Sequence, residues 1–484
     1  MVTKMMWYDY LYSVTGKPVY NSEDHFIKDG TTKYDDDQRT TIRYNLWQGA
    51  VHGRAMSTMW VWDRSYDENS ALYNSILTRP DCVAEAGYTS LDMMRSADDI
   101  IKLSSKTPEV ALFYSKTSRI FNDDHMGNLV LYYKALLCSG KRVGFVTETS
   151  LDKLSNYDCL IIPSVTHTTP EAVTAVKNYL TNGGKVIYYD ANCMKYDKFG
   201  KTLDNGTIIS RGTKFTVKDT NPVRLKLIEY FSNDRIRVKD NATGEAAKDI
   251  EYEYDISGGK ILINMVKFGA GTQNVSVYMD GQKLTGMKNI LTGEVTGDSH
   301  NLTGYTPLTL KMRYSTQTPS KPKNLSYRKD VLSWDDDEKA VKYNVYYKPQ
   351  NGSESLYTVT EDNFCSGMGD GVYRVEGVNT LGTVGESARI TVASELKVSF
   401  DEVNVNSNRV CATVTVRNTS EKFQKGVVIV MTKEGKVAVD DTWISPMGSI
   451  SFEVSFNGTT EQITASVGAS YDNQYMSVTY DVSE

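Results

Sequence analysis

The order of apolar and polar positions predicts a helix and then a strand at the start of the chain. Residues 5–14 carry apolar side chains at helical spacing, and Gly16 stands where a helix-ending glycine is expected. Residues 17–25 then favour extended backbone, with β-favouring side chains after a proline. Glu23 therefore falls at the carboxyl end of a short strand.

The same sequence of helix, glycine and strand occurs a second time. An apolar stripe predicts a helix that ends at Gly53 and buries Ile42, Leu46, Trp47 and Val51. Residues 57–62 are apolar on both faces, which is typical of a parallel strand covered on both sides. Residues 80–106 predict one further helix, whose candidate core residues are Leu91, Met94, Ile100 and Leu103. Together these elements amount to about a quarter of a (β/α)8 barrel.

Residues 107–203 alternate between strand and helix patterns. Short apolar runs are followed by amphipathic stretches, which is the order found in doubly wound parallel sheets. We therefore expect a flavodoxin-like α/β domain. The predicted strands are 110–114, 142–146, 159–165 and 185–189, and the predicted helices are 126–137, 151–154 and 169–182.

The remainder of the chain has mainly strand patterns. Residues 204–316 predict an antiparallel β-domain. A linker at residues 319–322, with a proline at each end, opens the segment 317–395, and residues 317–395 and 396–484 each predict a β-sandwich. The fold class is therefore multidomain α/β plus β, with a partial (β/α)8 barrel in residues 1–106. The clearest strands of the antiparallel domain are 235–238, 250–254, 260–264 and 275–278.

Composition excludes several kinds of partner. A net charge of −6 provides no basic surface for nucleic acid. A mean hydropathy of −0.41, without a long apolar run, predicts no membrane span. The six cysteines have neither metal-ligand nor disulfide-framework spacing, so we expect most of them to be buried, and we expect no metal and no cofactor.

Several segments resemble a known family of enzymes. Residues 17–25 (Lys-Pro-Val-Tyr-Asn-Ser-Glu-Asp-His), 46–49 (Leu-Trp-Gln-Gly) and 60–64 (Trp-Val-Trp-Asp-Arg) resemble strands 7 and 8 of retaining clan-A glycoside hydrolases, of the family-42 β-galactosidase type. Residues 151–189 resemble the trimerisation domain of that family, a degenerate relative of the class I glutamine amidotransferase fold. Residues 289–310 resemble the small antiparallel domain that ends many clan-A hydrolases. The resemblance implies a homotrimer.

Two of these regions are interpreted as architectural. An active amidotransferase needs a cysteine on a tight turn beside a His-Glu pair, whereas Cys138 and Cys159 are expected at a helix end and a strand start. Residues 317–395 resemble a fibronectin type III domain, with Trp334 as its core tryptophan and Tyr373 as its corner tyrosine. Such modules usually space other domains.

The family resemblance assigns roles to residues at the two barrel strands. Glu23 corresponds to the nucleophile, Trp62 to the floor of the subsite beside it, and Trp60 to a more deeply packed ring. Asn21 shares with Glu23 the strand face that is expected to point into the barrel, and His25 is interpreted as a loop contact or an orienter of Glu23. On spacing alone, a solvated strand-end carboxylate is the simpler interpretation of Glu23.

Two later positions bear on the substrate. Arg64 either pairs with a carboxylate at the rim of the site or forms a surface salt bridge. Tyr73, in the stretch Ser-Ala-Leu-Tyr at 70–73, stands where the family carries an acidic residue and a histidine that hold galactose hydroxyls. Because buried polar contacts decide sugar selectivity, the substrate is open between a galactoside, a mannoside and a related β-glycoside.

Retaining hydrolysis needs a second carboxyl group about 5–5.5 Å from the first. In the family, the acid/base glutamate follows an asparagine at the end of strand 4, whereas residues 1–106 match only strands 7 and 8. We therefore expect the C-terminal part of a larger retaining β-glycosidase that acts on an oligo- or polysaccharide and is inactive as this piece. Appended sandwiches are commoner on exported enzymes, so we expect an extracytoplasmic or secreted protein, with a cytoplasmic one as the alternative.

A second hypothesis belongs to another functional class. The chain is then a noncatalytic carbohydrate-binding or scaffold protein that keeps a relic of the barrel. Trp443, Tyr471 and Tyr475 are the candidate stacking platforms in its last domain, although a tryptophan in a sandwich is more often a core residue.

Overall fold

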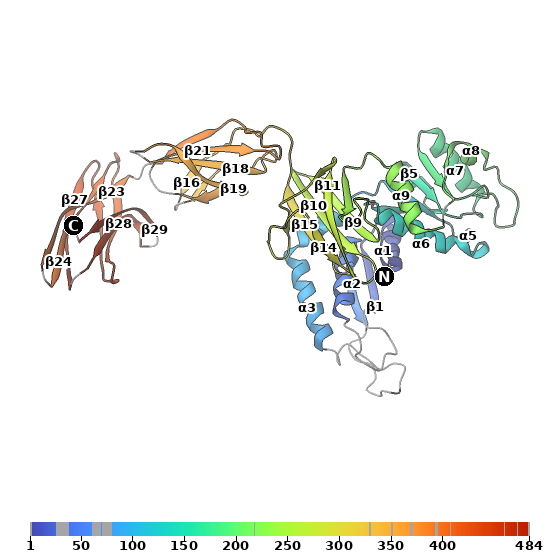
Figure 1. The fold of residues 1–484 in the computed structure, drawn as a ribbon, viewed down its shortest axis with the longest axis horizontal. Helices are drawn as coiled ribbons and strands as arrows, with labels where there is room; N and C mark the ends of the chain where they lie inside the picture. The colour runs from blue at the N-terminus through green and yellow to red at the C-terminus, as the bar shows by residue number, and fades with distance from the viewer. Residues whose placement is uncertain are drawn as a thin grey trace. The chain divides into compact units, whose positions relative to one another are not determined.

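The computed structural model divides the chain into two compact units, Met1–Met312 and Arg313–Glu484 (Figure 1). The finer division at residues 106, 203, 316 and 395 stays a prediction. Among the described residues, no helix is both long and apolar enough to cross a membrane. The structure describes residues 2–25, 38–60, 69, 80–216, 218–328, 331–349, 352–367, 371–392, 395–406, 408–458, 460–471 and 473–482.

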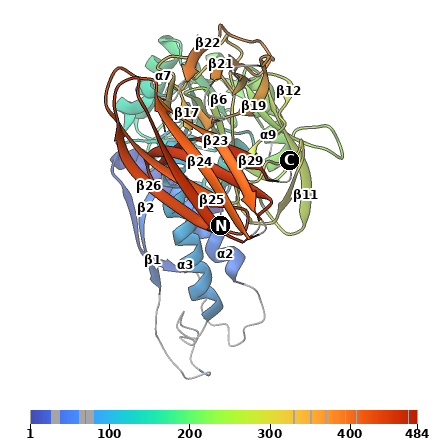
Figure 2. The same ribbon diagram turned by 90° about the vertical axis from the view of Figure 1, so that its left-hand side faces the viewer.

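The first unit opens with the two predicted helix–strand pairs, α1 (Val2–Thr15), β1 (Val19–His25), α2 (Arg39–Val51) and β2 (Arg54–Trp60). Gly16 and Gly53 follow the two helices with φ values of +64° and +82°, the left-handed conformation that favours glycine at a helix end. The two strands pair in parallel. Helix α1 packs on β1, and helix α2 packs on β2. Figure 2 shows the two strands side by side, with α2 and α3 drawn on the same side of them.

Residues 80–106 form two helices rather than the single one predicted. These are α3 (Pro80–Arg95) and α4 (Ala97–Ser104), with Ser96 between them. The face of α3 that contacts α2 carries Cys82 and Ala86. Leu91 and Met94 lie outside that face and are exposed, so their predicted burial is wrong. Apolar side chains lie on more of the surface of α3 than α2 covers, so some of them stay exposed.

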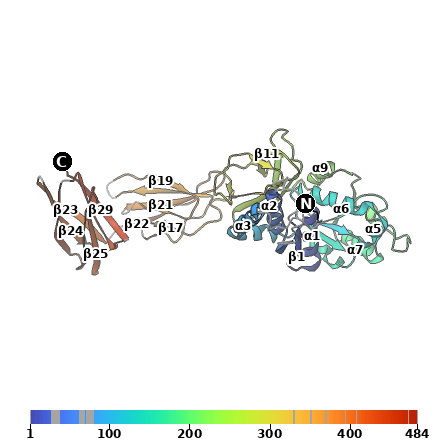
Figure 3. The same cartoon turned by 90° about the horizontal axis from the view of Figure 1, so that it is seen from below.

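The α/β region is a doubly wound parallel sheet, as predicted. Its strands lie in the order β4-β3-β5-β6-β7, which is the flavodoxin-like order. Figure 3 shows α6 and α7 on either side of this sheet, in agreement with their separate apolar clusters. The elements are β3 (Val110–Tyr114), α5 (Lys116–Phe121), α6 (Asp124–Leu137), β4 (Val143–Thr147), η2 (Leu151–Asn156), β5 (Cys159–Ile162), α7 (Pro170–Thr181), β6 (Lys185–Tyr188), α8 (Gly206–Arg211), β7 (Thr213–Lys214) and α9 (Thr220–Tyr230).

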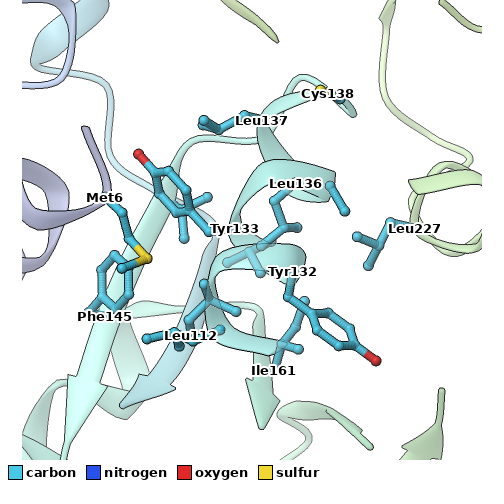
Figure 4. Close-up of a cluster of buried hydrophobic side chains, with 14 of the residues drawn as sticks. Met6, Leu112, Tyr132, Tyr133, Leu136, Leu137, Cys138, Phe145, Ile161 and Leu227 are labelled. Carbon is cyan, nitrogen blue, oxygen red and sulfur yellow. The ribbon is translucent and has the colours of Figure 1, made fainter. Parts of the chain in front are cut away.

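The largest apolar cluster joins the start of the chain to this sheet. Met6 of α1 packs beside Tyr133 of α6 and Phe145 of β4, and Leu227 of α9 lies on the other side of α6 (Figure 4). Leu112 and Ile161 supply the sheet side of the cluster. Since α1 and the α/β domain share one core, the two helix–strand pairs are fixed to that domain.

Two antiparallel sheets complete the first unit, in the orders β13-β15-β10-β9 and β12-β11-β14, with β8 also on β11. Ile100 and Leu103 of α4 are buried with Trp47 and Leu262, as predicted for the first two. Sequence patterning missed α8 and α9, which lie in a region predicted to be β. The strands are β8 (Ile236–Asp240), β9 (Ile250–Ser257), β10 (Lys260–Lys267), β11 (Thr272–Met279), β12 (Gln282–Lys283), β13 (Lys288–Asn289), β14 (His300–Thr303) and β15 (Leu308–Arg313).

The second unit contains two pairs of antiparallel sheets. In the first pair the orders are β16-β17-β20 and β19-β18-β21-β22, and Trp334 and Tyr373 are buried in the same cluster. The more specific fibronectin type III assignment stays a prediction. These strands are β16 (Ser326–Arg328), β17 (Val331–Ser333), β18 (Lys342–Lys348), β19 (Ser355–Thr360), β20 (Phe364–Ser366), β21 (Gly371–Val378) and β22 (Ala388–Val392).

The last pair of sheets has the orders β23-β24-β27 and β26-β25-β28-β29. Alternating valines from both sheets form its core. The strands are β23 (Leu396–Asn406), β24 (Arg409–Asn418), β25 (Gln424–Thr432), β26 (Val437–Ile444), β27 (Ser449–Asn457), β28 (Gln462–Ser470) and β29 (Asn473–Asp481).

Candidate functional site

The candidate site lies on the face of β1 and β2 that α1 and α2 leave open. Val19 is buried against the helices, whereas Tyr20 on β1 and Met56 and Met59 on β2 are exposed. The coverage of β2 on both sides, expected from its sequence, is therefore not supplied by the described part of this chain. Any ligand of the two strands has access to this open face.

Glu23 and His25 lie together on the open face. His25 Nε2 is 3.3 Å from Glu23 Oε1, and the two side chains are 41% and 58% exposed respectively. The His25 ring centroid is 5.9 Å from that of Trp60. The strand end thus presents a solvent-accessible carboxylate with an imidazole beside it and an indole beyond.

An irregularity in the strand changes which residues share a face. The parallel register moves from Asn21 opposite Ser57 to Asp24 opposite Met59, so β1 has one residue more than β2 between those pairs. Asn21 turns toward α1 and donates from Nδ2 to the Tyr8 hydroxyl at 2.9 Å. The expectation that Asn21 and Glu23 share one face through simple alternation is therefore wrong. The inserted residue reverses the alternation between them.

Asp24 is the buried carboxylate of this segment. It accepts hydrogen bonds from Arg54 at 2.7 Å and from Ser57 Oγ at 2.6 Å, and it also pairs with Lys4. The Arg54 guanidinium also donates to the Leu46 carbonyl of α2. Asp24 thereby holds β1 to α1, α2 and β2. It faces away from Glu23, so its role in this geometry is to position the strand end.

The other proposed substrate-binding residues lie outside the described residues. This applies to Trp62, Arg64 and Tyr73, whose roles stay predictions. Trp60 is half-buried at the end of β2, next to His25. No group of metal-binding side chains is present in the described ranges.

A buried charge cluster behind the open face was not predicted. His52, which caps α2, lies between Asp9 of α1 at 2.9 Å and Glu251 of β9 at 2.7 Å. Tyr133 of α6 also donates to Asp9, at 2.6 Å. Burial opposes the charged imidazole, but the two carboxylates outweigh it and raise the pKa of His52 well above its usual value.

A second buried cation extends the cluster. Arg142 donates to Glu253 of β9 at 3.0 Å and to the carbonyls of Val51 and Leu103. Burial raises the pKa of Glu253, although Arg142 and His52 oppose that rise. The cluster ties α1, α2, α6 and β9 together, so it fixes the strands of the candidate site to the α/β and antiparallel domains. Acidic residues at three alternate positions of β9, Glu251, Glu253 and Asp255, were the available sequence signal.

The α/β domain does not contain an amidotransferase nucleophile in its two candidate positions. Cys138 caps α6 and Cys159 begins β5, as predicted, and both are buried. Burial raises the pKa of Cys159 to about 12, so its thiol stays protonated. His125 accepts from the Ser115 amide and donates to the Pro163 carbonyl, which occupies both ring nitrogens.

Comparison with known proteins identifies the central domain. Residues 109–195 match the family model of the β-galactosidase trimerisation domain. Among curated proteins, nothing matches the chain.

Two solved structures share the fold of a large part of the chain. One is an exo-carrageenase of family 42 from Bacteroides ovatus, with 24% sequence identity, a TM-score of 0.53 and coverage of 64% of this chain and 43% of that one. The other is Gan42B, a family-42 β-galactosidase from an organism abbreviated G., with 13% identity, a TM-score of 0.50 and coverage of 64% and 56%. The matched part of the chain thus spans about half the length of each of these two structures.

Proposed function

We propose that this chain, which carries the trimerisation domain of the family-42 β-galactosidases and shares their fold, is part of a retaining β-glycosidase with Glu23 as its nucleophile. The observation that carries the proposal is the position of Glu23. Its carboxylate lies at the carboxyl end of a parallel strand, on the open face, beside an imidazole and an indole. That end of a strand is where β/α barrels keep their catalytic residues.

In the proposed reaction, a Glu23 oxygen attacks the anomeric carbon while the glycosidic oxygen leaves with a proton. Water then displaces the carboxylate from the glycosyl ester and restores both groups. His25 hydrogen-bonds one carboxylate oxygen and so orients the other toward the open face. Asp24, held by Arg54 and Ser57, keeps the strand end in place beneath it. The Trp60 ring provides an apolar surface at the same end of the site.

A second carboxyl group has to protonate the leaving oxygen. Asp24 is directed into the opposite face of the strand and is occupied by two cations, so it cannot take that role. We propose that polypeptide beyond the described residues supplies the acid, and that this chain alone does not hydrolyse glycosides. We further propose a homotrimeric assembly, an oligo- or polysaccharide substrate and an extracytoplasmic location.

The test compares the chain alone with the chain in its natural assembly. A tagged chain is purified from its natural source together with whatever copurifies, and both forms are assayed on aryl β-galactosides, β-glucosides, β-mannosides and β-fucosides. We expect hydrolysis only by the copurified assembly, and its loss in Glu23→Gln. The control Glu171→Gln changes an exposed carboxylate on α7 and retains activity. Turnover by the isolated chain, or an active Glu23→Gln assembly, contradicts the proposal.

A second candidate function, carbohydrate binding without catalysis, is favoured by one surface of the last sandwich. Trp443 lies on the outer face of β26 and is 65% exposed, whereas Ile444 next to it is in the core. Phe423 just before β25 and Tyr471 just after β28 are also exposed. The pairing of Gln424 with Ile444 and of Val427 with Gly468 brings all three rings to one end of the sheet. The side chain of Tyr475 lies outside the described part.

Adjacent strands are about 4.8 Å apart, so rings at the ends of three neighbouring strands extend over a length comparable with two sugar units. Flat exposed rings stack on pyranose faces through apolar contact. The full chain is therefore tested for retention on insoluble β-glycans, with Trp443→Ala as the variant. Phe364→Ala, which removes an exposed ring from β20, is the control. Retention that is lost only in Trp443→Ala supports this function, and equal retention by all three proteins contradicts it.

A further inference from the structure

A cavity of about 460 Å³ opens at the carboxyl edge of the α/β sheet. It lies where β3 and β4 end, and it is lined by Tyr10 of α1, Tyr114, Lys116, Arg119, Thr147 and Glu148. Its volume is within the range of about 300–1,000 Å³ that is usual for small-molecule sites. It is formed by different elements from the open face of β1 and β2.

The strand order explains why a cavity is expected at this edge. The chain runs from β3 outward to β4 and then returns across β3 to β5, so the order reverses at β3. In open α/β sheets, ligands bind outside the carboxyl ends of the strands near such a reversal. α1 adds a wall at this edge that the sheet alone does not have.

Two cations line the cavity without an acidic partner. Among the described residues, Lys116 Nζ forms no ion pair, and the guanidinium of Arg119 contacts only the Tyr114 hydroxyl, at 3.2 Å. By contrast, the buried Lys141 is neutralised by Glu109 and Asp234. An unneutralised pair of cations beside a cavity favours an anionic group on the ligand.

Other lining groups suit hydroxyls and a ring. Glu148 is held in place because it accepts from Ser115 Oγ and from the Lys116 amide at 3.3 Å. The Tyr10 hydroxyl has no hydrogen-bond partner in the described part of the chain. Burial, Tyr114 and Glu148 together raise the pKa of Tyr10, so this hydroxyl stays a donor. The Tyr10 and Tyr114 rings meet edge to face with centroids 5.2 Å apart and form an aromatic wall.

We propose that this cavity binds a small saccharide that carries an anionic group, separately from the site at Glu23. Lys116 and Arg119 contact the sulfate, carboxylate or phosphate. Glu148 accepts hydrogen bonds from sugar hydroxyls, Tyr10 donates one, and the aromatic wall contacts the ring. The site is independent of catalysis at Glu23.

Isothermal titration calorimetry on the full chain tests this site with four probes: galactose 6-sulfate, galacturonate, galactose 6-phosphate and neutral galactose. We expect at least one anionic sugar to bind ten-fold or more tightly than galactose, which also identifies the preferred anion. Affinity should fall ten-fold or more in the double variant Lys116→Gln/Arg119→Gln and about three-fold or more in Tyr10→Phe. Lys201→Gln, a change of an exposed lysine in the same domain, and Glu23→Gln should bind like the unaltered chain.

Two further measurements make the result decisive. Each variant is first shown to unfold at the temperature of the unaltered chain, which is expected because both cations are exposed. Inorganic sulfate is titrated as a fifth probe. The proposal is overturned if the double variant binds as tightly as the unaltered chain, if no anionic sugar binds better than galactose, or if inorganic sulfate binds as tightly as the sugar sulfate.

Discussion

Replacing His52 by leucine removes the cation between two buried carboxylates. In the folded chain, the two ring nitrogens of His52 lie 2.9 Å from Asp9 and 2.7 Å from Glu251, and all three side chains are almost fully buried. Hydrogen bonds to charged groups contribute about 1.5–3 kcal/mol each. Asp9 and Glu251 keep Tyr133 and Gln48 as donors, which limits the loss. We expect His52→Leu to cost about 3–5 kcal/mol, the usual cost of breaking a buried ion pair.

The loss of stability in His52→Leu is measured locally, because a chain of several domains does not unfold in one step. Hydrogen exchange measured by mass spectrometry gives the opening free energy of peptides from α2 and β9, the elements that the cluster joins. The expected loss corresponds to an increase of about 10²–10⁴-fold in the open population. The control Arg235→Leu removes a half-exposed pair with Asp280 and should cost less than about 1 kcal/mol. A loss below about 1 kcal/mol for His52→Leu would refute the assigned role.

The same residue determines a pH dependence. The folded pKa of His52 lies well above the value of about 6.5 expected in the unfolded chain. Below the unfolded pKa of about 6.5, the imidazole is protonated in both the folded and the unfolded chain, so it stabilises the fold fully. As pH rises from there through the folded pKa, the stabilisation is lost, by at most about 1.4 kcal/mol per pH unit. The opening free energy of α2 and β9 should therefore fall with rising pH in the unaltered chain, and this fall should be absent in His52→Leu.

Three further changes test other parts of the structure. Asp24→Asn leaves two buried cations without their carboxylate and should lower the stability of β1 by about 3 kcal/mol, measured by hydrogen exchange of its peptides. Gly140→Ala, at φ +75° with the Tyr252 ring in the space that the added Cβ needs, should lower the thermal unfolding temperature strongly, whereas Gly183→Ala, at φ +93° in open space, adds backbone strain without a clash and should lower it less. Trp334→Ala should destabilise its sandwich by about 3–5 kcal/mol in urea unfolding, whereas Trp443→Ala, at an exposed position of the last sandwich, should leave the stability of that last sandwich nearly unchanged.

Local patterning predicted the elements of the first unit where one rule applied. Gly16 and Gly53 marked the helix ends because left-handed backbone there costs glycine little. The apolar runs in residues 110–188 predicted the parallel sheet because its strands are covered on both faces. These signals depend only on residues that are close in the sequence, so tertiary contacts do not change the elements that they predict.

The missed features depend on distant contacts. Leu91 and Met94 were assigned to the core from helical spacing, but only a tertiary neighbour buries such a stripe. Asn21 faces α1 because of an inserted residue that alternation rules cannot anticipate. His52 meets Glu251 across 199 positions of sequence. The strand that carries Glu23 near its carboxyl end was thus predictable, whereas the orientation and the buried support of the site were not.

The most direct test of the central claim is to identify the residue that forms the glycosyl ester. The copurified assembly is incubated with 2,4-dinitrophenyl 2-deoxy-2-fluoro-β-glycosides of the four sugars, digested and mapped by mass spectrometry. The 2-fluoro group slows the release of the ester by water, so the ester accumulates. Glu23 as nucleophile predicts one labelled peptide, which contains residues 19–25, with the label on Glu23 and none in Glu23→Gln. A label on another carboxylate, in this chain or in a copurified one, would contradict the assignment.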